Sequence, residues 1–279
     1  MVVFPNCKIN LGLHVLEKRS DGYHNLETIF LPLSLKDALE VNSCLLKGSA
    51  SGFELSIAGE AIPGEPGSNL CTKAWQLLKK DYPDVPAVKM HLLKAIPAGA
   101  GLAGGSSDGA FTLLLLNQFF GLGLGQDKLL GYALQLGSDC PFFIINKPCL
   151  ATGRGEILEQ LSLDLSDYKT VVVYPDLHIN TAWAFSQLQP AKTSQSLKEI
   201  IREPIESWRE NLVNHFEEPV FNAHPSLRKI KDALYQAGAL YASMTGTGSC
   251  IFGIFRKKGR ITSLRLDGTN KVYYLHSQR

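Results

Sequence analysis

"IPAGAGLAGGSSDGA", residues 96–110, indicates the fold of this chain more clearly than any other segment. It contains five glycines and four alanines, and it leads directly into the apolar segment "FTLLLLNQFFG" at residues 111–121. A glycine-rich loop that ends at a helix N-terminus lets the backbone approach an anion closely, and the helix dipole favours negative charge there. The stretch therefore predicts a phosphate-binding loop. The alternative is a tight strand-to-helix connection without a ligand.

The residues that follow the glycines predict a buried helix. Ser106 or Ser107 is a suitable N-cap, and residues 110–120 are apolar on nearly all sides. Gly121 is suited to end the helix. A buried helix would hold the preceding loop rigidly in place.

The sequence excludes two well-known kinds of phosphate loop. A Walker A motif needs a lysine followed by serine or threonine after its last glycine, and residues 96–110 contain no lysine. The letters "GAGLAG", residues 99–104, match the dinucleotide-binding fingerprint, but the next strand carries no acidic residue about 20 positions on. The loop must therefore belong to another phosphate-binding fold.

Composition narrows the class of protein. The chain has 279 residues, of which 45% are hydrophobic and 19% charged, which predicts two modest globular domains with ample core. A formal net charge of +2 is too small to indicate a partner that is a nucleic acid or a membrane surface, so neither is expected. Six scattered cysteines without zinc-type spacing, and no signal-peptide pattern in "MVVFPNCKIN", indicate a cytoplasmic protein with buried thiols.

Helical and strand patterns are mixed along the chain, which predicts an α+β fold. The clearest strand is residues 8–16, where Lys8 and Asn10 alternate with apolar side chains. The other predicted strands cover residues 26–35, 37–43, 87–97, 138–145, 170–175 and 271–277, with a glycine turn at 150–158 and a loop and strand at 243–255. The predicted helices cover residues 68–80 (capped by Ser68), 110–120, 127–136 and 226–237, with helical stretches after Asn180 or Thr181 and around 196–217. Composition changes near residue 150, which divides the chain into residues 1–150 and 151–279.

The glycine-rich stretch resembles the second signature motif of the GHMP kinases (galactokinase, homoserine kinase, mevalonate kinase and phosphomevalonate kinase). "CKINLGL", residues 7–13, is similar to the N-terminal strand motif of that family, and "TGTGSCIF", residues 245–252, to its C-terminal glycine loop. Within the family, "KRSDGYHNLETIF" at 18–30, "GSNL" at 67–70, "LGSDCPFF" at 136–143 and "GRGEIL" at 153–158 resemble the branch whose small-molecule substrate carries a cytidine diphosphate moiety.

The resemblance implies a two-domain GHMP kinase fold with an active site in the interdomain cleft. Residues 1–150 would form an ATP-binding domain like domain 2 of ribosomal protein S5, and residues 151–279 the C-terminal GHMP substrate domain. The implied reaction is Mg²⁺-dependent transfer of the ATP γ-phosphate to a substrate hydroxyl, by a monomer or a homodimer. Two alternatives stay open: another GHMP kinase, of the homoserine or mevalonate type, and a nucleotide-binding sensor that kept the fold and lost catalysis.

Two residues carry the chemistry that the resemblance implies. Lys8 would stabilise the reacting hydroxyl and the transferred phosphoryl group. Electrostatic stabilisation of this kind is the main contribution of a protein to phosphoryl transfer. Asp139 would act as the general base that takes the proton of the hydroxyl. The simpler alternatives are a solvated lysine on an edge strand and an aspartate that caps a turn.

Two groups of binding residues follow from the same resemblance. The substrate residues are Asn10, Tyr23, His24, Thr181, Thr245, Gly246, Thr247 and Gly248, with Tyr23 stacking on the cytosine and His24 reading its edge. The ATP residues are Asn69, Lys94, Pro97, Ala98, Gly99, Ala100, Gly101, Leu102, Ala103, Gly104, Gly105, Ser106 and Ser107. No group of residues in the chain is expected to bind a metal ion by itself, because the Mg²⁺ arrives with ATP. Ser107 is expected to contact that ion.

The loop departs from the family pattern at three positions. Ala100 and Ala103 stand where glycine is usual, and alanine is expected only where the backbone has negative φ. Asp108 stands where related kinases have asparagine or alanine. A carboxylate there would repel the phosphates, so its side chain is expected to point away from them.

Overall fold

The computed structural model describes residues 1–43, 52–62, 66–190, 195–259, 261 and 264–275. Contacts between residues divide the chain into two compact units. The first unit consists of Met1–Cys7, Leu35–Ala98 and Ala103–Asn146, and the second of Lys8–Ser34, Gly99–Leu102 and Lys147–Arg279. The predicted domain limits, 1–150 and 151–279, stay a prediction.

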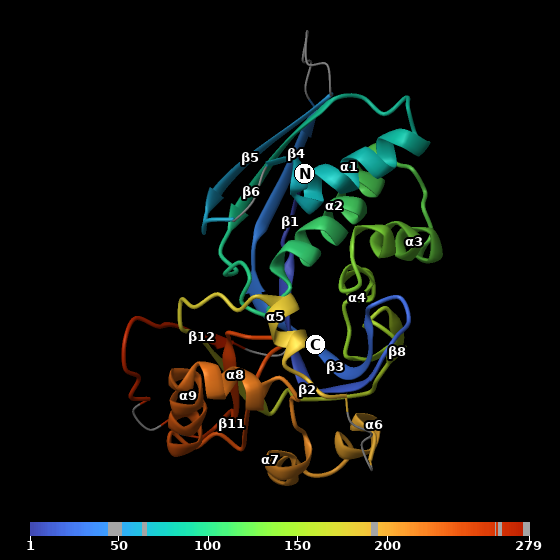
Figure 1. The fold of residues 1–279 in the computed structure, drawn as a ribbon. Helices are drawn as coiled ribbons and strands as arrows, with labels where there is room; N and C mark the ends of the chain where they lie inside the picture. Colours follow the sequence, from blue (N-terminus) through green and yellow to red (C-terminus); the bar gives the residue numbers. More distant parts are fainter. Residues whose placement is uncertain (44–51, 63–65, 191–194, 260, 262–263, 276–279) are drawn as a thin grey trace. The chain divides into compact units, whose positions relative to one another are not determined.

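A four-stranded sheet and four helices build the first unit. The sheet has the order β1 (Val2–Val3), β4 (Ala38–Ser43), β6 (Val88–Lys94) and β5 (Phe53–Gly59), and only the β5–β6 pair is parallel. The helices are α1 (Leu70–Asp81), α2 (Gly104–Phe120), α3 (Gln126–Leu136) and α4 (Cys140–Ile145), with a short 3₁₀ turn at Pro66–Ser68. Figure 1 shows α1 and α2 lying along the same face of this sheet, where they contact β5 and β4.

One predicted strand of this unit is wrong. Residues 138–145 were expected to be extended, but Cys140–Ile145 form the helix α4. Pro141 lies in the first turn, where its missing N–H costs nothing, and Phe142 and Phe143 are buried. A short apolar run cannot be assigned to helix or strand by periodicity alone, because both bury it equally well.

The predicted N-caps of two helices are also wrong. Asn69, and not Ser68, caps α1, and its side chain accepts a hydrogen bond from the N–H of Cys71 at 2.8 Å. Helix α2 begins at Gly104, so Ser106 and Ser107 lie inside its first turn. The N-cap position belongs to Ala103, which has a left-handed conformation with φ of 56° and makes no side-chain cap. The expected negative φ therefore holds at Ala100 but fails at Ala103.

Two four-stranded sheets form the second unit. One has the order β2 (Asn6–Lys18), β3 (His24–Lys36), β7 (Cys149–Thr152) and β8 (Ile157–Gln160). The other is antiparallel, in the order β10 (Tyr241–Met244), β11 (Ile251–Arg256), β9 (Tyr168–Tyr174) and β12 (Lys271–Leu275). The last predicted strand is thus confirmed as β12, and residues 276 and 277 lie outside the described residues.

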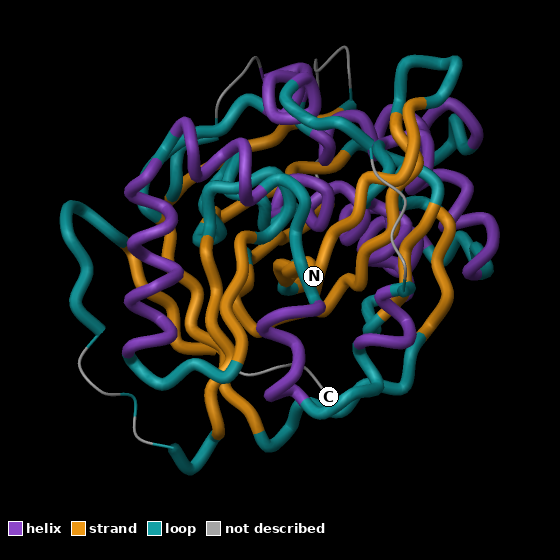
Figure 2. Tube along the Cα trace, turned by 60° about the horizontal axis from the view of Figure 1, so that its bottom comes forward, coloured by secondary structure: helices purple, strands orange, loops and turns teal. Residues whose placement is uncertain are grey.

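The helices of the second unit are mostly short. They are α5 (Thr181–Ser186), α6 (Leu197–Ile200), α7 (Trp208–Asn211), α8 (Glu217–Ala223) and α9 (Pro225–Gln236), with a 3₁₀ turn at Ile205–Ser207. Of the two residues predicted to start this helix, Asn180 caps α5 by accepting a hydrogen bond from the N–H of Trp183 at 2.9 Å. Helices (purple) and strands (orange) are mixed throughout the chain in Figure 2, which confirms the predicted α+β class.

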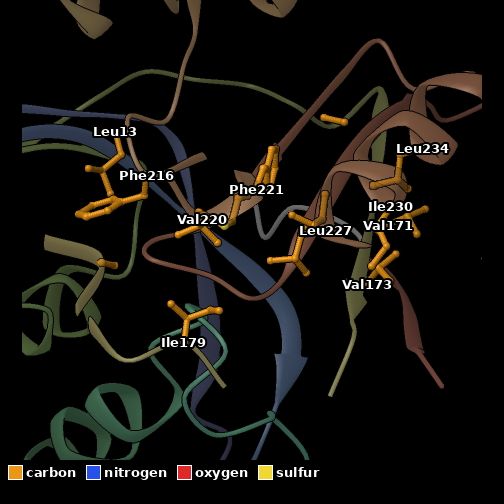
Figure 3. Close-up of a cluster of buried hydrophobic side chains, with 14 of the residues drawn as sticks. Leu13, Val171, Val173, Ile179, Phe216, Val220, Phe221, Leu227, Ile230 and Leu234 are labelled. Carbon is orange, nitrogen blue, oxygen red and sulfur yellow. The ribbon is translucent and has the colours of Figure 1, made fainter. Parts of the chain in front are cut away.

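Helices α8 and α9 pack on the β10–β11–β9–β12 sheet. Leu227, Ile230 and Leu234 recur along one side of α9 and are buried against Val171 and Val173 of β9. Figure 3 shows these side chains together with the neighbouring residues of β2 and α8. Burying an apolar side chain of this size contributes about 1.5–3 kcal/mol, so the cluster holds the strands and helices around the loop at 245–249 in place.

Five cysteines of the described residues are free thiols and buried, as predicted; Cys44 lies outside those residues. Among the helices that the structure describes, none is long and apolar enough to cross a membrane.

Candidate active site

A buried polar cluster surrounds Asn10 on β2. Lys8 donates a hydrogen bond from Nζ to Asn10 Oδ1 at 2.7 Å, and Asn10 Nδ2 donates to Thr28 Oγ1 at 2.9 Å. The backbone N–H of Asn10 donates to Thr245 Oγ1 at 3.0 Å. Lys8 and Asn10 are only 4% and 2% exposed. Lys8 is thus no solvated edge residue, and a buried ammonium group needs such polar partners.

The two glycine loops of the sequence meet at Gly101. Thr245 Oγ1 lies 3.1 Å from the carbonyl oxygen of Gly101, and Cys250 donates its N–H to the carbonyl of Ala100 at 3.1 Å. A Cβ on Gly101 would lie 2.1 Å from the carbonyl oxygen of Thr245, and φ of Gly101 is 79°. Only glycine fits this approach. Loops predicted to hold different ligands are therefore direct neighbours.

The loop at 245–249 is also held from its other side. Thr247 Oγ1 lies 3.4 Å from Thr181 Oγ1 at the start of α5, which brings these two predicted substrate residues together. Asn214 donates from Nδ2 to the carbonyls of Met244 at 2.8 Å and Gly246 at 2.9 Å. Asn214 was missed by the sequence analysis. No local pattern in "NLVNHF", residues 211–216, distinguishes this asparagine from its polar neighbours Asn211 and His215.

The predicted substrate residues Tyr23 and His24 follow a turn between β2 and β3. Tyr23 is 55% exposed, and its N–H donates to Asp21 Oδ1 at 3.1 Å. The ring of His24 stacks on Phe185 of α5 with 5.0 Å between centroids. Burial, with a smaller effect of the charge of Lys18, lowers the pKa of His24, so its ring is neutral at neutral pH. Phe185 was not found from the sequence, because nothing local links it to residue 24.

The predicted phosphate-binding loop contains residues of both compact units. Pro97, Ala98 and residues 103–107 belong to the first unit, and residues 99–102 to the second. Positive φ alternates along the loop at Gly99, Gly101 and Ala103. Ser107 Oγ, in the first turn of α2, is buried and has no hydrogen-bond partner among the described residues.

Lys94, predicted to line the ATP pocket, is held between two carboxylates. Its ammonium donates to Asp37 and, at 2.7 Å, to Asp108 Oδ2, and its side chain is 2% exposed. Asp108 therefore faces Lys94. Burial raises the pKa of Asp108 to about 8; Lys94 opposes the rise and Asp37 adds to it. Burial lowers the pKa of Lys94, but the two carboxylates outweigh this and the net shift is upward.

Asp139, the predicted general base, lies at the N-cap position of α4. Its side chain makes no capping hydrogen bond to that helix. Asp139 belongs to the first unit and Lys8 to the second. Their joint action on one substrate stays a prediction.

In the ranges that the structure describes, no group of three or more His, Cys, Asp or Glu side chains could hold a metal ion. The hydroxyl of Ser107 is a buried oxygen whose hydrogen-bonding capacity is unused. Mg²⁺ is commonly held by substrate phosphates with few protein ligands, and one such hydroxyl fits this pattern.

Comparison with known families gives two matches. The model described as "GHMP kinases N terminal domain" matches residues 69–147, and that described as "GHMP kinases C terminal" matches residues 195–273. A protein of Bacteroides fragilis (strain YCH46), 4-diphosphocytidyl-2-C-methyl-D-erythritol kinase, is 49% identical over 264 residues, which cover 95% of each chain.

Solved structures agree with these matches. The crystal structure of a 4-(cytidine 5'-diphospho)-2C-methyl-D-erythritol kinase superposes with a TM-score of 0.82 and 30% identity, covering 100% of both chains. The mevalonate kinase of Methanococcus jannaschii has a TM-score of 0.73 at 14% identity, covering 100% of this chain and 98% of its own. The second likeness concerns the fold alone.

Proposed function

Because this chain belongs to the GHMP kinase family, we propose that it transfers the γ-phosphate of ATP to the 2-hydroxyl of 4-diphosphocytidyl-2-C-methyl-D-erythritol. The products are ADP and the 2-phosphate of that substrate, an intermediate of non-mevalonate isoprenoid biosynthesis. The observation that carries this function is the 49% identity, over 95% of both chains, to a kinase of that name.

The phosphate loop supplies the binding site for ATP in this proposal. Alternating positive φ at Gly99, Gly101 and Ala103 is the backbone pattern that turns N–H groups toward an anion. The N-terminus of α2 adds the positive end of its dipole. Asn69 and Lys94 are proposed to lie near the adenine, with Lys94 fixed by Asp37 and Asp108.

Bound Mg²⁺ would neutralise charge on the transferred phosphoryl group. We propose that it arrives with ATP and that the unpartnered hydroxyl of Ser107 contacts it. Ser106 lies in the same turn of α2 and is proposed to contact a phosphate.

The remaining chemistry is a proton transfer and charge stabilisation. Asp139 takes the proton of the 2-hydroxyl as its oxygen attacks the γ-phosphorus, and the bond to the β-phosphate oxygen of ADP breaks. Lys8, fixed by its hydrogen bond to Asn10, stabilises the negative charge on the transferred group.

Tyr23 and His24 are proposed to recognise the cytosine. Tyr23 offers an exposed aromatic ring for stacking, and neutral His24 offers a ring nitrogen and backbone groups to the edge of the base. Thr181 and the loop Thr245–Gly248 are proposed to hold the rest of the acceptor, because Thr181 and Thr247 are neighbours.

The alternative functions have less support. A homoserine or mevalonate kinase activity would rest on likenesses of about 15% identity, which concern the fold alone. A catalytically silent sensor would have no need to keep both Lys8 and Asp139. We further propose that the enzyme acts in the cytoplasm as a monomer or homodimer, without nucleic-acid or membrane partners; the five buried free thiols among the described residues suit a reducing compartment.

The test is an ATP-consumption assay with three acceptors: 4-diphosphocytidyl-2-C-methyl-D-erythritol, homoserine and mevalonate. Turnover with the cytidyl acceptor alone, and a phosphate on its 2-oxygen by NMR, is the expected result. Turnover with either other acceptor at equal or greater kcat/KM would reject the proposal. Loss of turnover on removing Mg²⁺, and its return on adding the ion, tests the metal.

A further inference from the structure

Arg154 has no part in the chemistry described above, yet its side chain covers the ring of Tyr23. It lies in the turn between β7 and β8, and its guanidinium carbon is 4.9 Å from the centroid of that ring. This distance is within the range of a cation–π contact. Tyr23 remains 55% exposed, so the ring keeps an accessible surface beyond this contact.

Arg154 is itself held in place by Glu156. Its Nε donates to Glu156 Oε1 at 3.3 Å, and its backbone N–H donates to Glu156 Oε2 at 2.5 Å. Burial raises the pKa of Glu156, but hydrogen bonds and the charge of Arg154 outweigh this and lower it. Glu156 is therefore ionised at neutral pH, and its side chain is 17% exposed. Such anchoring reduces the rotamer freedom that an exposed arginine otherwise keeps.

The turn that carries Arg154 is joined to the strand that follows Tyr23. Leu26 donates its N–H to the carbonyl of Gly153 at 2.8 Å, and β3 pairs with β7 from Thr28 opposite Ala151. The charge of Arg154 also reaches Asp21, where it adds to the larger effects of Arg19 and the Tyr23 N–H that lower the pKa of that carboxylate. The two turns thus form one connected structure.

Asp21 and Arg154 fix different parts of Tyr23. Asp21 binds the backbone N–H, while Arg154 lies against the ring. A flat base gains most from a ring that is already oriented, because less side-chain freedom is lost on binding. A guanidinium on the ring also limits rotation of the exposed side chain about its χ angles.

We propose that Arg154 is a positioning residue for acceptor specificity, which orients Tyr23 for stacking on the pyrimidine base of the nucleoside diphosphate. The inference rests on the proposed function, since it deepens the role given to Tyr23. Arg154 acts through the tyrosine ring and does not bind the acceptor itself.

The test compares Arg154→Met and Arg154→Lys with the wild-type enzyme. Arg154→Met should raise KM for the cytidyl acceptor about three- to tenfold, with KM for ATP and kcat nearly unchanged. Arg154→Lys should lie between the two, because lysine keeps the charge but loses the planar group. Arg209→Met is the matched control: Arg209 lies 4.3 Å from the ring of Tyr235, a tyrosine with no proposed part in binding, and its loss should leave all constants unchanged.

A double-mutant cycle with Tyr23→Ala separates positioning from other roles. In the Tyr23→Ala background, Arg154→Met should have no further effect on KM for the acceptor. Additive effects would mean that Arg154 binds the acceptor directly, and a lower KM in Arg154→Met would mean that it blocks the ring; either result overturns the inference. An unchanged KM in Arg154→Met, with a lower melting temperature, would make the role purely structural and also overturns it. Failure of the wild-type enzyme to use the cytidyl acceptor would instead reject the proposed function.

Discussion

The ammonium group of Lys94 donates hydrogen bonds to both Asp37 and Asp108, and all three side chains are buried. Asp37 also accepts hydrogen bonds from the N–H groups of Ala95 at 2.6 Å and Ile96 at 2.9 Å. These two residues directly precede the predicted phosphate-binding residues of the glycine-rich loop, which begin at Pro97. Asp108 lies in α2, directly after that loop. The cluster therefore fixes the chain on both sides of the loop within the first unit.

Lys94→Met should destabilise the protein strongly. It leaves the carboxylate of Asp37 buried without its cation and Asp108 without its hydrogen-bond donor, and breaking a buried ion pair in this way typically costs about 3–5 kcal/mol of unfolding free energy. Lys89→Met is a matched control on the same strand, because Lys89 pairs with Glu54 at 3.0 Å but is 38% exposed. Its loss should cost at most about 1 kcal/mol. Urea denaturation measures both, and equal losses would contradict the structural role of Lys94.

Asp108 should make stability depend on pH. Its pKa in the folded protein, about 8, is above the usual aspartate value of about 4, so the folded state keeps a proton that the unfolded state releases between these values. The unfolding free energy should therefore fall as pH rises from about 4 to about 8, with no further loss from this group above that range.

Asp108→Asn removes this titration while keeping the size of the side chain. The wild type should lose unfolding free energy relative to Asp108→Asn as the pH rises from 5 to 8. Urea denaturation at several pH values gives this difference. A shift in favour of the wild type would mean that Asp108 is an ordinary ionised partner of Lys94.

Gly101→Val should impair the use of both substrates. A Cβ at this position would lie 2.1 Å from the carbonyl oxygen of Thr245, so the close packing of the glycine-rich loop against the loop at 245–249 cannot persist. We expect kcat/KM to fall at least about tenfold for ATP and for the acceptor alike. Gly131→Ala in α3 is the control, because nothing lies within 4 Å of its Cβ position, and it should keep full activity. Loss confined to ATP would show that the Thr245 contact is unimportant.

The contact between Gly101 and Thr245 could not be predicted from the sequence. The sequence indicated both glycine loops correctly, because each carries its own turn chemistry. From the sequence alone, Gly101→Val would be expected to weaken ATP far more than the acceptor. The carbonyl of Thr245 changes that expectation, and residues 101 and 245 are joined only by the fold.

The pairing of Lys94 with Asp37 could not be predicted from the sequence either. Lys94 and Asp108 were both singled out from the sequence, but Asp37 lies 57 positions from Lys94, and no local pattern links them. The strand prediction for residues 138–145 was wrong for a different reason, because a short apolar run suits a buried strand as well as the helix α4. The α+β class and most elements could be predicted because periodicity, caps and glycines act locally.

Tyr23→Ala should affect the acceptor and not ATP. Stacking on an aromatic ring is worth about 1–3 kcal/mol per base, so KM for the cytidyl acceptor should rise about tenfold or more. His24→Ala should raise KM for the acceptor less than Tyr23→Ala does if the backbone makes the contact to the base edge, although it also removes the stacking on Phe185. Steady-state kinetics with each substrate varied in turn decide this. A rise in KM for ATP alone would reverse the assignment of the two binding sites.

Asp139→Asn should abolish most of the turnover without weakening nucleotide binding. The amide keeps the size of the side chain and cannot take the proton of the 2-hydroxyl, so kcat should fall by about 10²–10⁴, the usual contribution of a general base. Asp127→Asn, an exposed aspartate in the first turn of α3, is the control and should keep normal kcat. Rapid-quench measurement of one turnover isolates the chemical step, and ATP titration gives the affinity. Near-normal turnover in Asp139→Asn would remove this residue from the mechanism, and equal loss in Asp127→Asn would point to a general effect of charge.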